Sequence, residues 1–357
     1  MTSFDKLLAI RPENALKRLG SKSKVCLLNS RDIFNSLAGE RVIVMTANTR
    51  IKHVIPGIMR AAEEMDAVVG FELAKSECNL EGGYTGMDSE AFFNTAVEYA
   101  DKRRFMHPFF IHGDHTTVRD TSEKEINSAK EHIEAGIKAG YTSFAIDASF
   151  NELKDNIQIT AELAKPILEK GIGLEVEVGE IKPAGQEAEL TTVEEAVEFI
   201  EGLKERGIHP KLLAINNGSK HGNYKPGEEV NIDLKRTGEV YNAVKKHGIS
   251  MAQHGITGTP LNLVGQFADY GIRKGNVGTL WQNIAHGGLP KDLFKKMNEW
   301  AESNNKDIKF ATKVFKKEID SIPSESAKDI EEWAYREAIA FIKAFRAKGT
   351  ASKMLEG

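Results

Sequence analysis

Residues 109–147 read FFIHGDHTTVRDTSEKEINSAKEHIEAGIKAGYTSFAID, and this stretch shows how the chain is built. It opens with an apolar segment over residues 109–114 and closes with a second one over residues 142–147. Between them, residues 122–140 form an amphipathic pattern that ends in glycine, as helices often do. A buried strand, a helix and a second buried strand make a βαβ unit, which predicts parallel strands.

The same unit recurs along the whole chain. Apolar, β-branched runs predict eight strands, at residues 42–46, 68–73, 109–114, 142–147, 173–178, 212–217, 250–255 and 272–277. Seven helical patterns separate these strands, and an eighth follows near residues 289–303. An open doubly wound sheet usually stops at five or six strands, whereas eight strands alternating with helices suit a closed barrel. We therefore predict an α/β fold of the (β/α)8, or TIM-barrel, type.

Two segments lie outside this repeat. Residues 1–40 predict an N-terminal helical extension, and residues 306–357 predict C-terminal helices that pack on the barrel or at a subunit interface. Residues 41–305 would then form the (β/α)8 barrel as the catalytic domain. No low-complexity tract or Pro/Ser-rich linker divides the chain, so we expect one domain with appendages.

Composition narrows the class of protein. The chain has 41% hydrophobic and 28% charged residues, a net charge of -4 at pH 7, and two cysteines, Cys26 and Cys78. It has no long basic run, no paired-cysteine zinc motif, and no stretch of the roughly 18 apolar residues that a membrane span needs. These features predict a cytoplasmic protein that acts on a small molecule, with no nucleic acid or membrane as partner.

Side chains able to bind a metal follow several predicted strands, at the end where barrel enzymes build their sites. His115 follows the third strand, His221 the sixth and His254 the seventh. One such histidine is usually a satisfied loop residue, but three at converging strand ends predict a shared imidazole site for one metal ion. Six other histidines lie in or beside helical patterns and are expected to be structural: His53, His107, His132, His209, His247 and His286.

The fifth strand carries Glu175 and Glu177 two residues apart, hence on the same face. Burying these carboxylates without a partner would cost several kcal/mol, so we expect each to bind a cation or a basic side chain.

Glycine-containing turns follow three consecutive strands: HGNYKPG at 221–227, HGITGT at 254–259 and GNVGT at 275–279. Backbone N–H groups in such turns can form an anion-binding concavity, and the last strands of barrels frequently carry phosphate sites. We therefore predict a phosphate site here, helped by Ser219, Lys225, Thr257 and Thr279.

Taken together, these motifs resemble the class II fructose-bisphosphate aldolases, in matching order from about Val42 to Lys353. HGDH looks like that family's H-x-D-H, IDASF like its I-D-x-S, LEVEVGE like its L-E-x-E-x-G, KHGNYKPG like its H-G-x-Y-K, and HGITGT like its H-G-(G/S)-S-G. The resemblance implies a glycolytic type of carbon–carbon lyase. It would cleave or form fructose 1,6-bisphosphate or a related ketose phosphate, through a zinc-stabilised enediolate of dihydroxyacetone phosphate.

The resemblance also implies metal ligands. His115, His221 and His254 would hold one catalytic zinc ion, while Glu177 and Asp147 would hold the metal in an alternate or second position. A monovalent cation is a further expected ion. The expected assembly is a homodimer or a larger homo-oligomer.

Two proton-transfer residues and a set of donor contacts follow from the same resemblance. Asp114 would exchange a proton with the aldol hydroxyl, and Glu187, in the loop after the fifth strand, would remove the proton from the donor ketone. The positions that match donor contacts are Gly222, Lys225, Gly255, Thr257, Asn276 and Thr279. A Schiff-base aldolase would instead need a desolvated lysine on a barrel strand, and the fifth, sixth and seventh strands carry none.

Departures from the family pattern leave the acceptor open. The family's N-x-D-T after the eighth strand reads NVGT here, so Gly278 stands where the family has an aspartate. The family's D-P-R segment near the C-terminus is replaced by AKDIEEW. The aldehyde acceptor is therefore either phosphorylated and bound differently, or a different, unphosphorylated aldehyde. A non-catalytic aldolase-like subunit, and a different metal chemistry such as isomerisation or phosphoester hydrolysis, are the other open interpretations.

Overall fold

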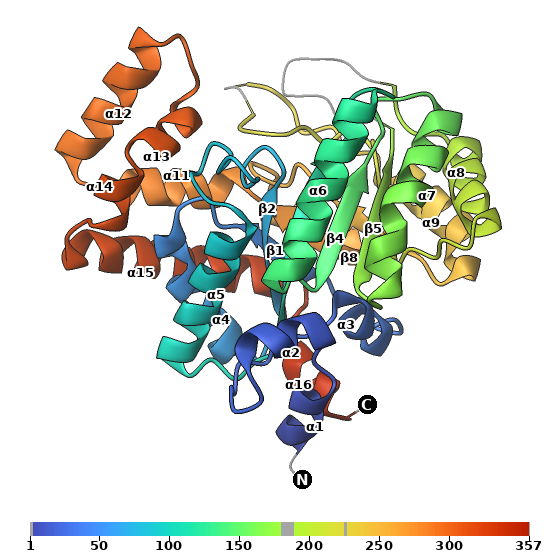
Figure 1. Ribbon diagram of the computed structural model, residues 1–357, viewed down its shortest axis with the longest axis horizontal. Helices are drawn as coiled ribbons and strands as arrows, with labels where there is room; N and C mark the ends of the chain where they lie inside the picture. The colour runs from blue at the N-terminus through green and yellow to red at the C-terminus, as the bar shows by residue number, and fades with distance from the viewer. Residues whose placement is uncertain (1–2, 180–188, 225–226, 357) are drawn as a thin grey trace.

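A closed barrel of eight parallel strands forms the centre of the computed structural model, which describes residues 3–179, 189–224 and 227–356 (Figure 1). The strands pair in chain order, and the first pairs with the last to close the ring. Their bounds are β1 Val44–Asn48, β2 Val69–Ala74, β3 Phe109–Thr117, β4 Ser143–Asp147, β5 Gly173–Val178, β6 Leu212–Ile215, β7 Ser250–Gln253 and β8 Ile272–Val277. The predicted fold is confirmed, and every observed strand overlaps a predicted one.

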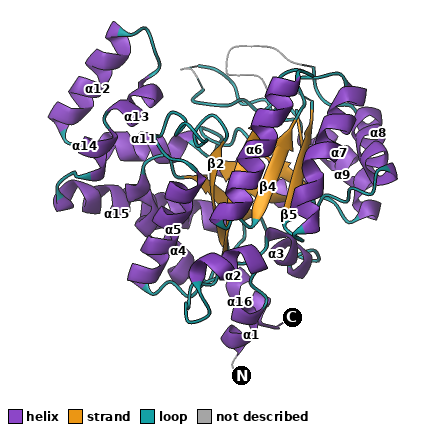
Figure 2. Cartoon of the chain, viewed as in Figure 1, coloured by secondary structure: helices purple, strands orange, loops and turns teal. Residues whose placement is uncertain are grey.

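Helices alternate with the strands and cover the outside of the barrel (Figure 2). Between consecutive strands lie α4 Ile55–Met65, α5 Ser89–Arg103, α6 Glu123–Ala139, α7 Leu153–Glu169, α8 Val193–Glu205, α9 Leu234–Val244 and α10 Leu261–Val264. Helix α6 shows why these segments are helical. The Ser122 hydroxyl caps its start by accepting from the Glu125 N–H, and Gly140 ends it with φ 110°. Its buried face includes Ala129 and Ile133.

Helix α15 (Ser324–Ala344), from late in the chain, completes the outer layer of helices. Helix α11 (Thr279–Gly288) follows β8 directly and was not predicted, because the eighth helix was expected only near residues 289–303. Helix α12 (Lys291–Ser303) lies where the eighth helix was predicted, but it packs mainly on α13 (Ala311–Val314) and the turn η4 (Ile308–Phe310). Helix α15 (Ser324–Ala344) instead packs on α4 and α11. The order of helices along the chain does not show which late helix packs its apolar face on the outer layer of the barrel.

The N-terminal end of the barrel is closed by the two ends of the chain. Figure 1 shows α1 (Ser3–Ala9), α2 (Glu13–Leu19), α3 (Ser30–Ser36) and α16 (Thr350–Glu356) grouped there, near both termini. Leu7, Phe34 and Met354 from these helices join an apolar cluster with Phe110 and Leu212 from the strands. The polar residues of the strands lie at the opposite end, where the strands have their C-termini. We call this end the mouth.

The remaining elements are short. They are α14 (Lys316–Asp320) and the turns η1 (Lys52–Val54), η2 (Lys245–His247) and η3 (Phe267–Tyr270). No helix in the described part of the chain has both the length and the apolar character needed to cross a membrane.

Candidate metal centre and active site

Three histidines from distant parts of the chain meet at the mouth. His115 lies in β3, His221 lies in the segment after β6, and His254 directly follows β7. Their ring centroids are 4.4 Å apart for His115 and His254, 5.1 Å for His115 and His221, and 6.3 Å for His221 and His254. One nitrogen from each ring lies within 4.8 Å of the others. Ligand atoms of one zinc ion lie about 3–4 Å apart, so this spacing is close to what a single ion needs.

An irregularity in β3 turns His115 toward this cluster. Consecutive residues of a regular strand face opposite sides, so Asp114 and His115 would normally point apart. The pairing of β3 with β4 shifts register between Gly113 and Thr116, and His115 has φ 35°. This left-handed conformation is typical of a bulge, which re-aims a side chain. As a result, Asp114 and His115 both line the pocket at the mouth.

A close approach between two loops brings His221 and His254 together. Gly255 follows His254 and has φ 66°. A Cβ at this position would lie 2.7 Å from the carbonyl oxygen of Lys220, the residue before His221. Only glycine lets the two loops approach this closely, which explains the glycine in the HGITGT turn.

Carboxylates hold two of the three rings in the orientation that metal ligands require. Glu175 Oε1 lies 2.7 Å from His254 Nε2, and Glu177 Oε1 lies 2.9 Å from His115 Nδ1. Asp147 Oδ2 lies 3.3 Å from the same Nδ1 of His115. A metal-binding histidine almost always donates the N–H of its other ring nitrogen to a carboxylate, a backbone carbonyl or a water molecule. The nitrogens left over, His254 Nδ1 and His115 Nε2, face each other at 2.7 Å.

The electrostatics of the cluster also fit a cation. Burial, together with His115 and His254, lowers the pKa of His221 to about 3, so its ring is neutral at pH 7 and can bind a metal. Burial also acts to lower the pKa of His115, but Glu177 and Asp114 outweigh it and hold that pKa well above its usual value. Asp147 and Glu177 form a second group with His115 whose ligand atoms lie within 4.8 Å of one another. A second ion position beside His115 is therefore chemically reasonable.

Asp114 is held between two amides. Asn48 Nδ2 donates to its Oδ2 and Asn276 Nδ2 donates to its Oδ1, each at 3.0 Å. Burial would raise the pKa of Asp114, but its electrostatic interactions with His115, His254 and Lys274 outweigh burial and hold that pKa below the usual value. Asp114 is therefore an anion with both oxygens directed by hydrogen bonds.

A buried layer of charge lies directly beneath the histidines. Lys274 in β8 is 0% exposed, and its Nζ lies 2.8 Å from Glu175 Oε2 and 3.3 Å from Glu72 Oε2. Lys274 also donates to Asn276 Oδ1 at 2.8 Å. It supplies the basic partner expected for Glu175. It also connects Glu175, which orients His254, with Asn276, which holds Asp114. Lys274 and Glu72 were not among the residues predicted for the site.

The histidines lie in a pocket of about 630 Å³, a size typical of sites for small molecules. Five of the six predicted donor contacts line it: Gly222, Gly255, Thr257, Asn276 and Thr279. Lys225 and Glu187 lie outside the described residues. The Thr257 hydroxyl accepts from the Leu280 N–H at 3.1 Å, which ties the turn after β7 to the first turn of α11.

One side of this pocket consists of residues that were not predicted to belong to the site. Arg50 follows β1, Tyr84 follows β2, His286 lies in α11 and Lys309 lies in η4. We call these four residues the α11 wall. His286, expected to be only structural, lines the pocket with a buried Nε2 that has no hydrogen-bond partner. No motif marks these positions, because they come from the segments after β1 and β2, from α11 and from η4.

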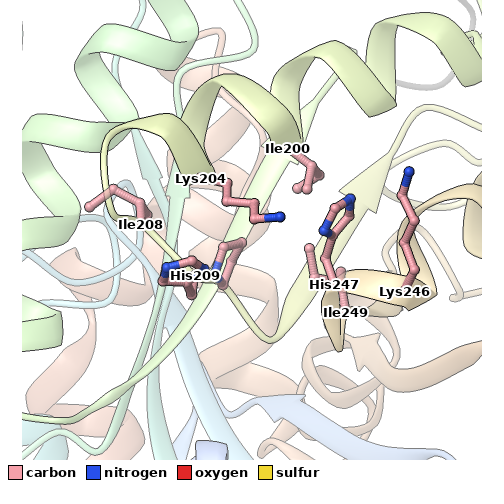
Figure 3. Close-up of a pocket in the computed structure, with 8 residues that line it drawn as sticks. Ile200, Lys204, Ile208, His209, Lys246, His247 and Ile249 are labelled. Carbon is pink, nitrogen blue, oxygen red and sulfur yellow. The ribbon is translucent and has the colours of Figure 1, made fainter.

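A second hollow, of about 220 Å³, lies at the other end of the barrel, where β6 and β7 begin (Figure 3). Its lining residues are Ile200, Lys204, Ile208, His209, Pro210, Lys246, His247 and Ile249. They include no carboxylate and none of the predicted site residues. We call it the basal hollow.

Comparison with known proteins points to one family. Residues 28–334 match the family model described as "Fructose-bisphosphate aldolase class-II". The chain is 27% identical over 276 residues to a fructose-bisphosphate aldolase of Geobacillus stearothermophilus, covering 76% of this chain and 86% of that one. It is 28% identical over 238 residues to a fructose-bisphosphate aldolase of Streptococcus pneumoniae, covering 65% and 72%.

Solved structures show the same fold. The YdjI aldolase from Escherichia coli K12 has a TM-score of 0.64 and 20% identity, covering 91% of this chain and 99% of that one. The fructose-bisphosphate aldolase from Campylobacter jejuni has a TM-score of 0.66 and 18% identity, covering 90% and 95%. Because the identities are only 18–20%, this likeness shows a shared barrel fold and no more.

Proposed function

The chain belongs to the class-II fructose-bisphosphate aldolase family, and from this premise we propose how its own residues carry out the aldol reaction. It is an aldolase, a carbon–carbon lyase. The proposed reaction is the reversible cleavage of fructose 1,6-bisphosphate, or a related ketose phosphate, to dihydroxyacetone phosphate and an aldehyde. The meeting of His115, His221 and His254 in one pocket gives this proposal its main support.

We assign the three histidines to a divalent cation, zinc. Three imidazoles suit zinc and leave positions open for substrate oxygens, and binding of the ion would displace the ring proton from each ligand nitrogen. A bound zinc ion would supply the Lewis acidity that polarises the donor ketone. Glu175 and Glu177 orient His254 and His115, and Asp147 with Glu177 is the proposed alternate position for the metal. A monovalent cation is proposed from the family resemblance alone.

Proton transfer is assigned to two carboxylates. Asp114 would accept the proton of the aldol hydroxyl in cleavage and return it in condensation, because Asn48 and Asn276 hold it as an oriented anion. Glu187 is the proposed group for the proton on the donor carbon, from the family resemblance.

The donor phosphate is assigned to the side of the pocket formed by the last three strands. Gly222, Gly255, Thr257 and Thr279 line that side, and Thr279 begins α11. Free N–H groups at a helix N-terminus favour a bound phosphate. Lys225 is proposed to assist, and Asn276 to contact the donor ketone.

A Schiff-base reaction is disfavoured by the state of the buried lysine. Lys274 is the lysine on a barrel strand that such a reaction would use, but a nucleophilic lysine needs a lowered pKa. Burial acts in that direction, yet Glu175 and Glu72 outweigh it and raise the pKa of Lys274 above its usual value. Lys274 is thus a charged positioning residue beneath the histidines.

Metal removal tests the proposed function. A chelator should lower aldol cleavage by roughly two to three orders of magnitude, and one equivalent of zinc per chain should restore it, because Lewis acidity supplies several kcal/mol of the barrier lowering. Borohydride added with substrate should leave activity unchanged. Activity that survives complete metal removal, or a lysine trapped by borohydride, would reject the proposal.

Two further proposals rest on the family resemblance: a cytoplasmic location and a homodimeric or larger assembly. Light scattering on the purified chain tests the assembly.

A further inference from the structure

A buried row of polar side chains connects the segment before the barrel with the metal-binding pocket. Ser30 Oγ lies 2.7 Å from Ser143 Oγ, which lies 2.7 Å from Nδ1 of His112. On the other side of this ring, His112 Nε2 lies 3.7 Å from Glu175 Oε2. Glu175 contacts the proposed ligand His254 through its other oxygen, at 2.7 Å. All five residues are at most 2% exposed, and the proposed function has not used the first three.

Helix α3 places Ser30 at the start of this row. The helix packs beside the start of β5 (Figure 1). The Ser30 N–H donates to the carbonyl oxygen of Thr142, the residue before β4, at 3.3 Å. A Cβ at Gly173, the first residue of β5, would overlap Ser30 Oγ. Only glycine leaves room for the hydroxyl at this point, so Ser30 is held between the starts of two strands.

The His112 ring carries a single proton. Burial, together with Lys274, lowers the pKa of His112 to about 3, so the ring is neutral at pH 7. A neutral imidazole has one nitrogen that donates and one that accepts. A proton on Nδ1 would point to Ser143, whereas a proton on Nε2 would point to Glu175.

The surroundings of the ring favour a proton on Nε2. An unprotonated Nε2 would direct its lone pair at the Glu175 carboxylate, whereas an N–H is attracted to it. Among the described residues, no group forms a hydrogen bond with Nε2. Glu72 is the other carboxyl group on β2 near this ring, and neither of its oxygens has a hydrogen-bond partner in the same part of the chain. Glu72 therefore does not donate to the ring.

Lys274 does not donate to Nε2 either. An ammonium has three N–H groups, and three oxygen atoms of other residues surround this one. They are Glu175 Oε2 and Asn276 Oδ1, each at 2.8 Å, and Glu72 Oε2 at 3.3 Å. With no donor available to Nε2, the ring proton lies on Nε2, and Nδ1 is the nitrogen that accepts.

The two serines complete this arrangement. Because Nδ1 accepts, Ser143 donates its one hydroxyl proton to His112. Ser143 then has only lone pairs left, so Ser30 donates to Ser143. Without the Ser143 hydroxyl, Nδ1 would be buried with no partner and the ring would no longer be held from behind.

We propose that Ser30 and Ser143 are positioning residues of the metal centre. They hold the His112 ring with its proton on Nε2, facing Glu175, which orients the His254 ligand. The inference rests on the proposed metal centre of the aldolase. It gives the segment before the barrel, expected from the sequence to be only a helical extension, a part in that centre.

The first test is the tautomer of His112 in the metal-free wild-type protein. Labelling histidine with ¹⁵N gives ring ¹H–¹⁵N correlations that differ between the two tautomers, and the His112 signals are those lost in His112→Asn. We expect a proton on Nε2 and an accepting Nδ1 at pH 7. A proton on Nδ1, or on both nitrogens, would overturn the proposal.

The second test is zinc affinity, measured by competition with a coloured chelator. Ser143→Ala should raise the Kd for zinc about tenfold, the lower end of the usual effect of removing a group that supports a metal ligand. Ser30→Ala should raise it less, because Ser30 acts through Ser143. For the same reason, the double variant should bind zinc as Ser143→Ala does.

Ser89→Ala is the matched control for zinc affinity. Like Ser30, Ser89 is a buried serine at the first position of a helix, but it has no part in the row. Its substitution should leave the Kd for zinc unchanged. An unchanged Kd in Ser143→Ala, an equal rise in Ser89→Ala, or additive losses in the double variant would each reject the positioning role.

Aldol cleavage separates failure of this inference from failure of the proposed function. If zinc-loaded wild type cleaves a ketose phosphate but Ser143→Ala binds zinc as tightly as wild type, the positioning role is wrong and the aldolase assignment stands. If zinc-loaded wild type neither cleaves a ketose phosphate nor exchanges a proton of dihydroxyacetone phosphate with solvent, the proposed function fails, whichever tautomer His112 has.

Discussion

The pocket at the mouth and the basal hollow both contain lysines and histidines, but these groups are held very differently. At the mouth, Lys274 is 0% exposed and contacts two carboxylates, and Asp114 is 3% exposed and bonded by two amides. In the basal hollow, Lys204 is exposed and makes no contact to a carboxylate of the described chain, while Lys246 lies 3.9 Å from Glu201 with both side chains more than half exposed.

The difference separates a built site from a surface hollow. Burying a charge costs several kcal/mol unless it is paired, so Lys274 and Asp114 persist only in fixed positions with partners. Exposed lysines are solvated and hold no fixed geometry, so nothing organises a ligand in the basal hollow. Substitutions in the two regions should therefore differ greatly in effect.

The largest effect should come from His254→Ala. Removing one of three imidazoles and leaving Glu175 without its histidine should abolish metal binding and lower kcat/KM by roughly three orders of magnitude. Elemental analysis of metal per chain and a cleavage assay measure both. His247→Ala in the basal hollow is the control and should keep both values. Full metal content in His254→Ala would show that the ion lies elsewhere.

A smaller but still large effect should come from Asp114→Asn. The amide matches the carboxylate in shape but cannot accept a proton, so kcat should fall by about 10²-fold while metal content stays at the wild-type level. Steady-state kinetics with metal analysis measure the two values separately. A variant within fivefold of wild-type kcat would remove Asp114 from the proton-transfer role.

The smallest effect should come from the double variant Lys204→Ala, Lys246→Ala in the basal hollow. Substitutions at exposed positions usually change stability by no more than about 0.5 kcal/mol, and neither lysine contacts the pocket at the mouth. We expect kcat/KM within about twofold of wild type and a nearly unchanged Tm in a thermal melt. A clear change in kcat/KM would show that the basal hollow communicates with the mouth.

The barrel could be predicted from the sequence because the same pattern, an apolar strand segment followed by an amphipathic helical segment, is repeated along the chain. Apolar runs at regular intervals predict strands wherever they occur, and β5 and β8 begin and end at the predicted residues. The position of α15 in the outer layer could not be predicted in this way. Both α12 and α15 are amphipathic, and the choice between them depends on their packing against α4 and α11.

The candidate site was predictable only where residues follow strands in recognisable motifs. The three histidines do so, and the structure brings them together. The bulge at His115 has no sequence signature, so β3 was expected to end at Asp114, whereas it continues to Thr117. The α11 wall was missed because Arg50, Tyr84 and Lys309 come from three loops that meet only through tertiary packing.

The pairing of Lys274 with Glu72 and Glu175 has a consequence for how the barrel folds. These residues lie in β8, β2 and β5, so the cation that neutralises the interior carboxylates enters with the last strand. A partly assembled sheet without β8 would hold two carboxylates in an apolar interior with no cation beside them. Closure of the ring and neutralisation of its interior are thus one cooperative event, and a chain truncated before β8 should not retain a stable sheet.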